Sequence, residues 1–243
     1  MVQPKPVYRR VLLKISGEGL AGADGFGIAA DALGHVGGEI REVGGLGVQL
    51  AVVVGGGNIL RGSAFAREGK FPEATAHYMG MLATVMNALA LQETLEGMGV
   101  PTRVLSAMPV AMVCEPFARR RCVHHLEKGR VVVLAGGTGR PFVTTDTAAA
   151  LGAAEISADV VVKATQVDGV YSADPKKDPK ARLYDRLTYD QVIDDRLAVM
   201  DLSAVELCQR CRIPIVVFNL HVSGNLKRVV LGEPVGTVVS AKN

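Results

Sequence analysis

The sequence of 243 residues contains no tryptophan, and aromatic residues make up only 5% of it. Hydrophobic residues still account for 49%, so we expect a core of valine, leucine and alanine, as in parallel sheets covered by helices. No apolar run reaches the roughly 18 residues of a membrane-spanning helix. Residues 1–10 also lack the apolar core of a secretory signal. We therefore expect a soluble, cytoplasmic protein.

Charge and cysteine are scarce as well. The net charge of +3 is too small to indicate a nucleic acid or a membrane surface as partner. Four cysteines in a chain of this length indicate free thiols rather than a disulfide framework. Cys208 and Cys211 form a C-x-x-C pair, but Cys114 and Cys122 do not repeat that spacing. A redox or zinc role for the pair stays open, and packing of the thiols in a helix is favoured.

Several common catalytic motifs are missing. The sequence has no G-x-x-x-x-G-K-[ST] loop, no G-x-S-x-G elbow, no H-E-x-x-H helix and no H-R-D loop. No G-x-G-x-x-G segment opens a helix with an acid about twenty residues later, which disfavours a dinucleotide cofactor. His124 and His125 are adjacent and cannot share a helix face, so we expect them to be structural.

Short runs of β-type residues are spread along the chain, near residues 10–15, 48–54, 103–106, 131–135, 159–163, 214–218 and 236–239. Helical patterns lie between them, and this alternation is typical of a mostly parallel sheet with helices on both faces. From Tyr171 to Tyr184 the chain is polar and contains two Asp-Pro pairs, which break regular structure. A loop of this length in a compact domain is often functional.

Three helices are predicted in more detail. The first spans about 29–43, the second runs from Glu73 to Met98 after Pro72, and the third covers 116–128 before Gly129. Apolar residues at helical spacing predict the buried faces of the first two: Ala29, Leu33, Val36, Ile40 and Val43, and then Met79, Leu82, Met86, Leu89 and Leu95.

Two features of these helices allow more than one interpretation. Met79, Met81 and Met86 could form a ligand surface, although packing in the core or at a subunit interface is favoured. The triplet Arg119–Arg121 could bind RNA. A solvated or inter-subunit face fits it better, because no basic surface accompanies the triplet.

Three glycine-rich turns each follow directly on a strand-type run: Lys14–Gly17, Gly55–Asn58 and Gly136–Gly139. Glycine lets backbone N–H groups approach a bulky anion, because no Cβ is in the way. In an open α/β sheet the ligand binds at the carboxyl ends of the strands. We therefore predict one phosphate-rich pocket, built from several strand ends, in a protein that handles nucleotides.

Cations and a helix start accompany these turns. Lys14, Arg61 and Lys163 all fall at or just beyond the carboxyl end of a strand. The segment Thr144–Asp146 precedes a helix predicted for 147–155, and the N-terminus of a helix presents free N–H groups to a phosphate. The same segment can be an ordinary N-cap, and both interpretations can hold together.

Five segments stand out as motifs: Lys14–Glu18 (KISGE), Gly55–Gly62 (GGGNILRG), Tyr78–Thr84 (YMGMLAT), Thr138–Asp146 (TGRPFVTTD) and Lys163–Tyr171 (KATQVDGVY). Together they resemble the bacterial uridylate (UMP) kinases, which belong to the amino-acid-kinase superfamily. The similarity extends over about residues 8–239. The M-G-M-L-A-T helix separates UMP kinases from the amino-acid and carbamate kinases of the superfamily.

This resemblance implies a fold and an activity. The fold is a three-layer αβα sandwich in a single domain over 1–243, with a nucleoside-monophosphate half at about 1–160 and an ATP half at about 161–243. The activity is transfer of the γ-phosphoryl group of ATP to UMP with Mg²⁺, which gives UDP in pyrimidine nucleotide synthesis. The resemblance also implies a homohexamer, activation by GTP and inhibition by UTP.

The resemblance further implies roles for individual residues. The implied catalytic residues are Lys14, Arg61, Lys163 and Asp146. ATP is implied to contact Lys14, Ile15, Ser16, Gly17, Gly57, Arg61, Thr165, Tyr171 and Asp174. UMP is implied to contact Gly56, His77, Thr138, Gly139, Arg140, Pro141, Phe142, Val143, Thr144 and Thr145. An effector-linked loop is implied at Gly22, Ala23, Asp24, Gly25, Phe26 and Gly27. Asp146, Asp174 and Asp201 are candidates near the metal, and none is singled out as its ligand.

Two positions depart from the family pattern. Many members carry Asp-Arg-x-x-x-Asp before the M-G-M helix, where this chain has Pro72, Glu73 and His77. The second acid usually contacts the UMP ribose, and a histidine cannot accept two hydrogen bonds from two hydroxyls as a carboxylate can. We therefore expect weaker UMP binding. Val143 replaces the second Phe of P-F-F-T-T-D, which loosens uracil selectivity or, as favoured, only changes packing.

Two other functions stay open at this point. One is a sibling phosphotransferase that acts on a carboxylate such as aspartate, glutamate or carbamate, although the M-G-M helix and the lack of an appended regulatory domain argue against it. The other is a nucleotide-sensing regulator with decayed activity, which His77 slightly supports. The sequence does not decide the oligomeric state, the response to effectors or the preference between UMP and CMP.

Overall fold

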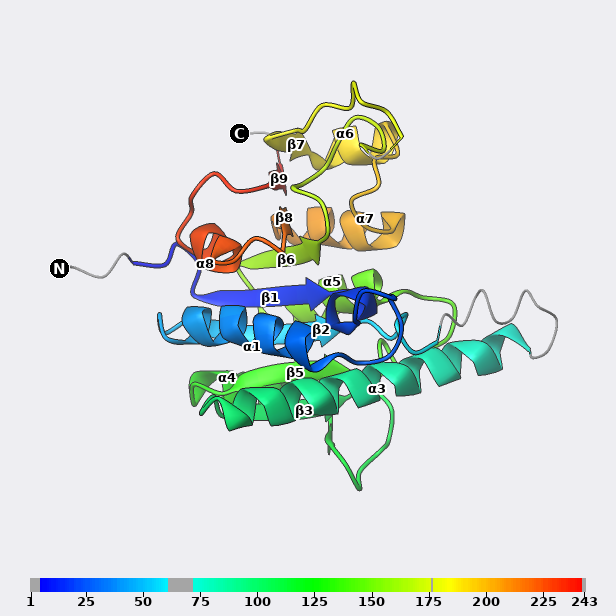
Figure 1. Ribbon diagram of the computed structural model, residues 1–243, viewed down its shortest axis with the longest axis vertical. Coiled ribbons are helices and arrows are strands. Elements are labelled where there is room, and N and C mark those ends of the chain that lie inside the picture. The colour runs from blue at the N-terminus through cyan, green and yellow to red at the C-terminus, as the bar shows by residue number, and fades with distance from the viewer. Residues whose placement is uncertain (1–4, 61–71, 176, 242–243) are drawn as a thin grey trace.

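The computed structural model describes residues 5–60, 72–175 and 177–241 (Figure 1). Arg61, to which the sequence assigns a catalytic and phosphate-binding role, lies outside the described residues. No helix within the described ranges is long and apolar enough to cross a membrane.

The described residues form one nine-stranded sheet in the order β4-β3-β5-β2-β1-β6-β8-β9-β7. Neighbouring strands pair in parallel except for β8 and β9, which are antiparallel. The predicted mostly parallel sheet is therefore confirmed. The strands are β1 Arg10–Ile15, β2 Gln49–Val54, β3 Thr102–Ser106, β4 Glu115–Pro116, β5 Val131–Ala135, β6 Val160–Thr165, β7 Arg186–Thr188, β8 Ile215–Asn219 and β9 Thr237–Ser240.

Helices cover both faces of this sheet (Figure 1). They are α1 Ala30–Gly44, α3 Glu73–Gly97, α4 Arg119–Glu127, α5 Thr145–Ile156, α6 Tyr189–Asp194, α7 Leu202–Cys211 and α8 Asn225–Val230, with a short 3₁₀ helix η1 at Gly17–Leu20. Leu13 of β1 packs in a core with α1, α3 and α8. Leu12 packs in a second core with α4, α5, α6 and α7. Because side chains alternate along a strand, these two cores lie on opposite faces, as in the expected αβα sandwich.

The predicted strand runs are all present, and two short strands were missed. β4 has only two residues, Glu115 and Pro116, which pair with Leu105 and Ser106 of β3. Such a segment carries no apolar alternation that a sequence pattern would reveal. Because these residues belong to the sheet, the prediction that the third helix starts at 116 was wrong, and α4 begins at Arg119. Gly129 follows α4 with a φ of +73°, as expected of a glycine that ends a helix.

The buried face of α3 differs from the predicted stripe. Leu82 and Met86 are 45% and 54% exposed, whereas Leu95 is buried as expected. The face turned to the protein is formed mainly by small or polar residues: Ala76, Met81, Ala83, Thr84, Val85, Asn87, Ala88, Leu91 and Leu95. Apolar residues occur around the whole circumference of this helix, so their spacing could not select one face. The small residues let the second glycine turn approach α3 closely, since a Cβ on Gly56 would lie 2.6 Å from the carbonyl oxygen of Gly80.

The cysteines are free thiols. Cys122 and Cys208 are buried, and burial raises the pKa of both thiols to about 12, which makes them poor nucleophiles. Cys211 is exposed. Of the two adjacent histidines, His125 is buried and contacts Glu115 at 3.3 Å and Arg130 at 2.9 Å, so it joins β4 to α4 as a structural residue.

The first two glycine turns are in direct contact. A Cβ on Gly17 would lie 2.3 Å from Oδ1 of Asn58 and 2.7 Å from the backbone nitrogen of Gly57. We predict that Gly17→Ala lowers the free energy of unfolding by about 1–3 kcal/mol, the usual cost of overpacking. Urea denaturation measures this change.

Gly34→Ala is the matched control, because Gly34 lies within α1 and a Cβ there meets open space among the described residues. Alanine should stabilise that helix by about 0.5–1 kcal/mol. A Gly17→Ala protein that is as stable as the wild type would contradict the close contact between the turns.

Candidate active site

The carboxyl ends of four adjacent strands, β5, β2, β1 and β6, bring the predicted motifs together. Lys14 of β1 is the register partner of Val53 on β2 and of Lys163 on β6, and Val53 is in turn the partner of Leu134 on β5. Parallel strands end at a common edge, so the three glycine turns and both lysines lie at one edge of the sheet. The predicted convergence of these segments is therefore confirmed as geometry.

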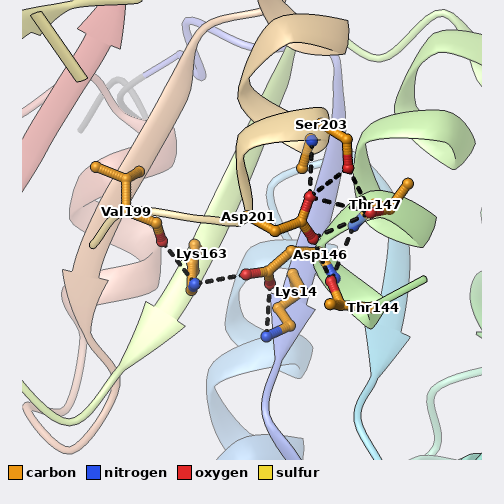
Figure 2. A network of polar contacts seen from close by, with 9 residues as sticks. Lys14, Thr144, Asp146, Thr147, Lys163, Val199, Asp201 and Ser203 are labelled. Atoms are coloured by element: carbon orange, nitrogen blue, oxygen red, sulfur yellow. Dashed lines mark hydrogen bonds and ion pairs between the residues drawn. The ribbon is translucent and has the colours of Figure 1, made fainter. Parts of the chain in front are cut away.

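One carboxylate holds the two lysines (Figure 2). Nζ of Lys14 lies 2.7 Å from Oδ1 of Asp146, and Nζ of Lys163 lies 2.8 Å from Oδ2 of the same residue. Lys163 also donates a hydrogen bond of 2.6 Å to the carbonyl oxygen of Val199. The side chains of Lys14, Asp146 and Lys163 are only 9%, 13% and 16% exposed. We refer to these three residues as the lysine–aspartate cluster.

Burial and charge compete in this cluster. Burial raises the pKa of Asp146, but the ammonium groups of Lys14 and Lys163 outweigh burial and hold that pKa below its ordinary value. Burial also lowers the pKa of Lys163, against the pull of Asp146, and the charge of Lys14 adds to the lowering. Asp146 is thus ionised at neutral pH. Two lysines and one aspartate give the cluster a formal charge of +1 at the sheet edge.

The start of α5 fixes the position of Asp146. The helix begins with Thr144 as N-cap, whose side chain accepts hydrogen bonds from the backbone N–H of Asp146 at 3.0 Å and of Thr147 at 3.4 Å. The helix therefore starts two residues earlier than the predicted 147. The N-cap interpretation of this segment is confirmed, and the remaining free N–H groups of the first turn fit an anion as well.

Asp201 connects this cap to α7 (Figure 2). Its carboxylate accepts hydrogen bonds from the hydroxyls of Thr144, Thr147 and Ser203. As the N-cap of α7, it also accepts a hydrogen bond from the backbone N–H of Ala204. Burial raises the pKa of Asp201, but these donors lower it below the ordinary value. Asp201 therefore joins the starts of α5 and α7 through hydrogen bonds, and its charge also raises the pKa of Lys163, against the effect of burial.

A cavity of about 300 Å³ opens beside the cap. Its lining residues are Gly56, Gly57, Leu60, His77, Gly80, Met81, Thr84, Gly137, Thr138, Arg140, Val143, Thr144 and Thr145. Seven of the ten residues predicted to contact UMP line it, whereas Gly139, Pro141 and Phe142 lie in the same loop without lining it. Gly137 was predicted through its glycine turn, and Met81 only as part of a possible ligand surface. Leu60, Gly80 and Thr84 were not assigned as site residues. Gly80 and Thr84 lie on the face of α3 that the predicted stripe missed.

His77 lines this cavity and lies near Phe142. The two ring centroids are 5.2 Å apart, and the backbone N–H of Phe142 donates to Nδ1 of His77 at 3.4 Å. Phe142 has a φ of +68°, which is unusual for a bulky residue. Nε2 of His77 is buried and has no hydrogen-bond partner among the described residues, although Oε1 of Glu73 lies 3.6 Å away.

The residues predicted to contact the adenosine end of ATP lie beyond β6. Thr165 ends that strand and donates a hydrogen bond of 2.7 Å to the carbonyl oxygen of Val167. Tyr171 forms an isolated bridge with Leu183, and Asp174 is exposed in the loop that follows. The role of these residues in binding ATP stays a prediction.

The predicted effector segment 22–27 borders a second cavity of about 570 Å³, lined by Glu18, Ala21, Gly22, Ala23, Asp24, Gly25, Gln166 and His221. This cavity lies at the carboxyl ends of β1, β6 and β8. The described residues contain no group of three or more His, Cys, Asp or Glu side chains that could hold a metal ion.

Comparison with known proteins defines the class. A sequence profile described as the amino acid kinase family matches residues 9–219. Since this is most of the chain, the protein belongs to the amino acid kinase family.

Two relatives that match nearly the whole chain are both named uridylate kinase. The chain is 53% identical over 235 residues to a uridylate kinase of Methylococcus capsulatus, which covers 97% of this chain and 98% of the relative. It is also 53% identical over 237 residues to the chloroplastic uridylate kinase PUMPKIN of Arabidopsis thaliana, which covers 98% of this chain and 70% of that protein.

Solved structures agree with this. A UMP kinase from Bacillus anthracis superimposes with a TM-score of 0.94 at 38% identity, over 97% of both chains. A uridylate kinase from Archaeoglobus fulgidus gives a TM-score of 0.72 at 33% identity, over 95% of this chain and 99% of that one. The resemblance to uridylate kinases inferred from the motifs is thereby confirmed.

We predict that Asp146→Asn lowers the free energy of unfolding by about 3 kcal/mol at pH 7, because two buried ammonium groups lose their shared counter-charge. Urea denaturation measures the difference. Asp190→Asn is the control, because Asp190 is exposed and contacts only Gln209 in the hydrogen bonds described, at 2.7 Å.

The pH dependence of this difference has a defined sign. The folded-state pKa of Asp146 lies below the ordinary 3.8. The stabilisation that its ionised carboxylate gives the folded protein is therefore fully present above pH 3.8. The contribution is lost as the pH falls from 3.8 through the folded-state pKa. An Asp146→Asn protein with wild-type stability at pH 7 would show that the carboxylate does not hold the lysines.

Proposed function

We propose that this protein transfers the γ-phosphoryl group of ATP to UMP and releases UDP and ADP. The observation that carries the proposal is the lysine–aspartate cluster, which lies at a sheet edge beside a nucleotide-sized cavity and a helix N-terminus. The names of the relatives, uridylate kinases and UMP kinases, support the choice of UMP.

The chemistry suits the residues present. The acceptor is a phosphate whose second pKa is about 6, so it is already anionic at neutral pH and requires no general base. The difficulty is to bring two polyanions together and to stabilise charge on the transferring group. Lys14 and Lys163 supply positive charge at fixed positions, and the backbone N–H groups of the glycine turns and α5 supply donors.

The two nucleotides are assigned to opposite sides of the cluster. UMP occupies the 300 Å³ cavity with its phosphate toward Gly56, Gly57 and the start of α5. The triphosphate of ATP follows the turn Lys14–Gly17, and its adenosine end extends toward Thr165, Tyr171 and Asp174. This assignment rests on the family motifs and on the position of the cavity.

Mg²⁺ is proposed to arrive as part of the ATP complex and to neutralise charge on the transferring phosphoryl group. The carboxylate of Asp146 already binds two lysines, and that of Asp201 already accepts hydrogen bonds from hydroxyl groups. This agrees with a metal that is held mainly by the phosphates of ATP. Mg²⁺ is commonly held by nucleotide phosphates and water together with only one or two carboxylates.

Regulation and assembly are part of the proposal. GTP is proposed to activate the enzyme and UTP to inhibit it, with segment 22–27 linked to the response. A homohexamer is proposed, and an exposed apolar row on α3 is suited to a subunit interface: Tyr78 is 40% exposed, Leu82 45% and Met86 54%. Location in the cytoplasm is proposed as well.

A coupled ADP-release assay with ATP and Mg²⁺ tests the activity. UMP should be the preferred acceptor over CMP, aspartate and carbamate. Release with aspartate or carbamate instead would indicate a carboxylate kinase, and no release with any acceptor would indicate a nucleotide-sensing regulator. Addition of GTP or UTP to the same assay tests regulation, and sedimentation velocity tests the hexamer.

Lys14→Ala should lower kcat by about 10²–10³, the scale for removal of one charge-stabilising donor. Steady-state kinetics at saturating UMP and ATP measure this change. Lys227→Ala serves as control, because Lys227 lies on α8 and contacts Glu42 at 3.7 Å, outside the proposed site. A Lys14→Ala enzyme within threefold of the wild type would reject the role of this lysine.

His77→Asp should lower the KM for UMP. A carboxylate at this position can accept hydrogen bonds from both ribose hydroxyls, which a histidine cannot do. His77→Asn is the control, since it matches the shape of the aspartate without the charge. Glu73 is four residues away on the same helix face and repels a new carboxylate by about 0.2–0.5 kcal/mol, so Glu73→Gln is combined with both variants. An unchanged or higher KM for His77→Asp would count against a ribose contact at this position.

A further inference from the structure

Two asparagines form a fully buried pair behind the second glycine turn. Asn58 in the turn and Asn87 on α3 are both 0% exposed. Nδ2 of Asn87 donates to Oδ1 of Asn58 at 2.7 Å, and Nδ2 of Asn58 donates to Oδ1 of Asn87 at 3.1 Å. The two side-chain amides thus face each other in a reciprocal pair.

The remaining amide hydrogens of the pair bind two backbone carbonyls. Asn87 donates to the carbonyl oxygen of Gly55 at 2.7 Å, and Asn58 donates to that of Gly27 at 2.6 Å. The backbone N–H of Gly27 returns a bond of 2.8 Å to the carbonyl oxygen of Asn58. Each side-chain amide donates two hydrogen bonds and accepts one, so the network satisfies both groups.

This network fixes the turn on both sides of its phosphate-facing residues. Gly55 and Asn58 bracket Gly56 and Gly57, which line the proposed UMP cavity. Asn58 also packs against Gly17, because a Cβ added at Gly17 would lie 2.3 Å from Oδ1 of Asn58. The directions of the N–H groups of Gly56 and Gly57 therefore depend on the pair.

The same network binds segment 22–27 at its last residue, Gly27, which has a φ of +70°. That segment lines the second cavity with Gly22, Ala23, Asp24 and Gly25. A buried amide pair is not needed for packing, because apolar groups of the same shape can be nearly as stabilising. Its hydrogen bonds do supply fixed directions, which apolar contacts do not.

We propose that Asn58 and Asn87 are positioning residues for phosphoryl transfer, which hold the turn Gly55–Asn58 in its phosphate-binding geometry and couple it to segment 22–27. The proposal rests on the proposed function. It assigns neither asparagine a contact with substrate. Any ligand that shifts segment 22–27 acts on the phosphate turn through this pair.

The test compares Asn87→Leu, which removes the hydrogen bonds at similar volume, with Asn87→Asp, which keeps the shape but turns an oxygen toward the carbonyl of Gly55. At a temperature well below unfolding, kcat per folded molecule should fall at least tenfold in both. Thr102→Val is the control, because Thr102 is equally buried and binds the carbonyl oxygen of Val100 at 2.9 Å, at the amino end of β3. Its kcat should stay within twofold of the wild type.

Two further readouts separate positioning from stability. Hydrogen exchange of the Gly27 amide should be at least tenfold faster in Asn87→Leu, whereas amides within α5 should keep wild-type rates. The kcat of the double variant Asn58→Leu/Asn87→Leu should be no more than about threefold below that of the less active single variant, because the two residues act as one unit.

The results decide separately on the positioning role, on the coupling to segment 22–27 and on the proposed function. Variants with lower melting temperatures but wild-type kcat and KM would overturn positioning, and so would failure of both Asn87 variants to fold. Unchanged exchange at Gly27 would overturn the coupling. A wild-type protein without UMP-dependent ADP release would overturn the proposed function and this inference with it, whereas an active wild type with unaffected variants overturns the inference alone.

Discussion

The structure depends on one carboxylate between two ammonium groups. Lys14 and Lys163 are partners across parallel strands, so the sheet itself forces two like charges together where they are largely buried. Burial lowers the pKa of Lys163, and the negative charge of Asp146 opposes that effect. Asp146 keeps both lysines in place with contacts of 2.7 and 2.8 Å. The cluster still retains one positive charge to offer to a phosphate.

The position of that carboxylate is in turn a property of the helix start. Thr144 caps α5, and Asp201 holds the cap hydroxyl and at the same time caps α7. A displacement of α7 would therefore reach the lysines through two hydrogen-bonded residues. On the opposite face of the sheet, the asparagine pair plays the corresponding part for the second glycine turn. Both supports are polar, so they define directions as well as distances.

Much of this could be predicted from the sequence, for a physical reason. Glycine turns after valine-rich runs mark the carboxyl ends of parallel strands, and such ends share one edge, so Lys14, Lys163 and Thr144 were expected to meet. That Asp146 binds both lysines could not be predicted, because this contact depends on where the start of α5 packs against β1 and β6. The buried face of α3 was misassigned because small residues, not large ones, contact the turn. The Asn58–Asn87 pair has no local signal, since each amide finds its partner only in the folded protein.

A crystal structure of the protein with UMP and a non-hydrolysable ATP analogue tests the central claim most directly. The account predicts that the acceptor phosphate and the terminal donor phosphate meet at the lysine–aspartate cluster. Nζ of Lys14 and of Lys163 should each lie about 2.7–3.2 Å from a phosphate oxygen. Two bound nucleotides whose phosphates contact neither lysine, with the contacts of Asp146 unchanged, would contradict it.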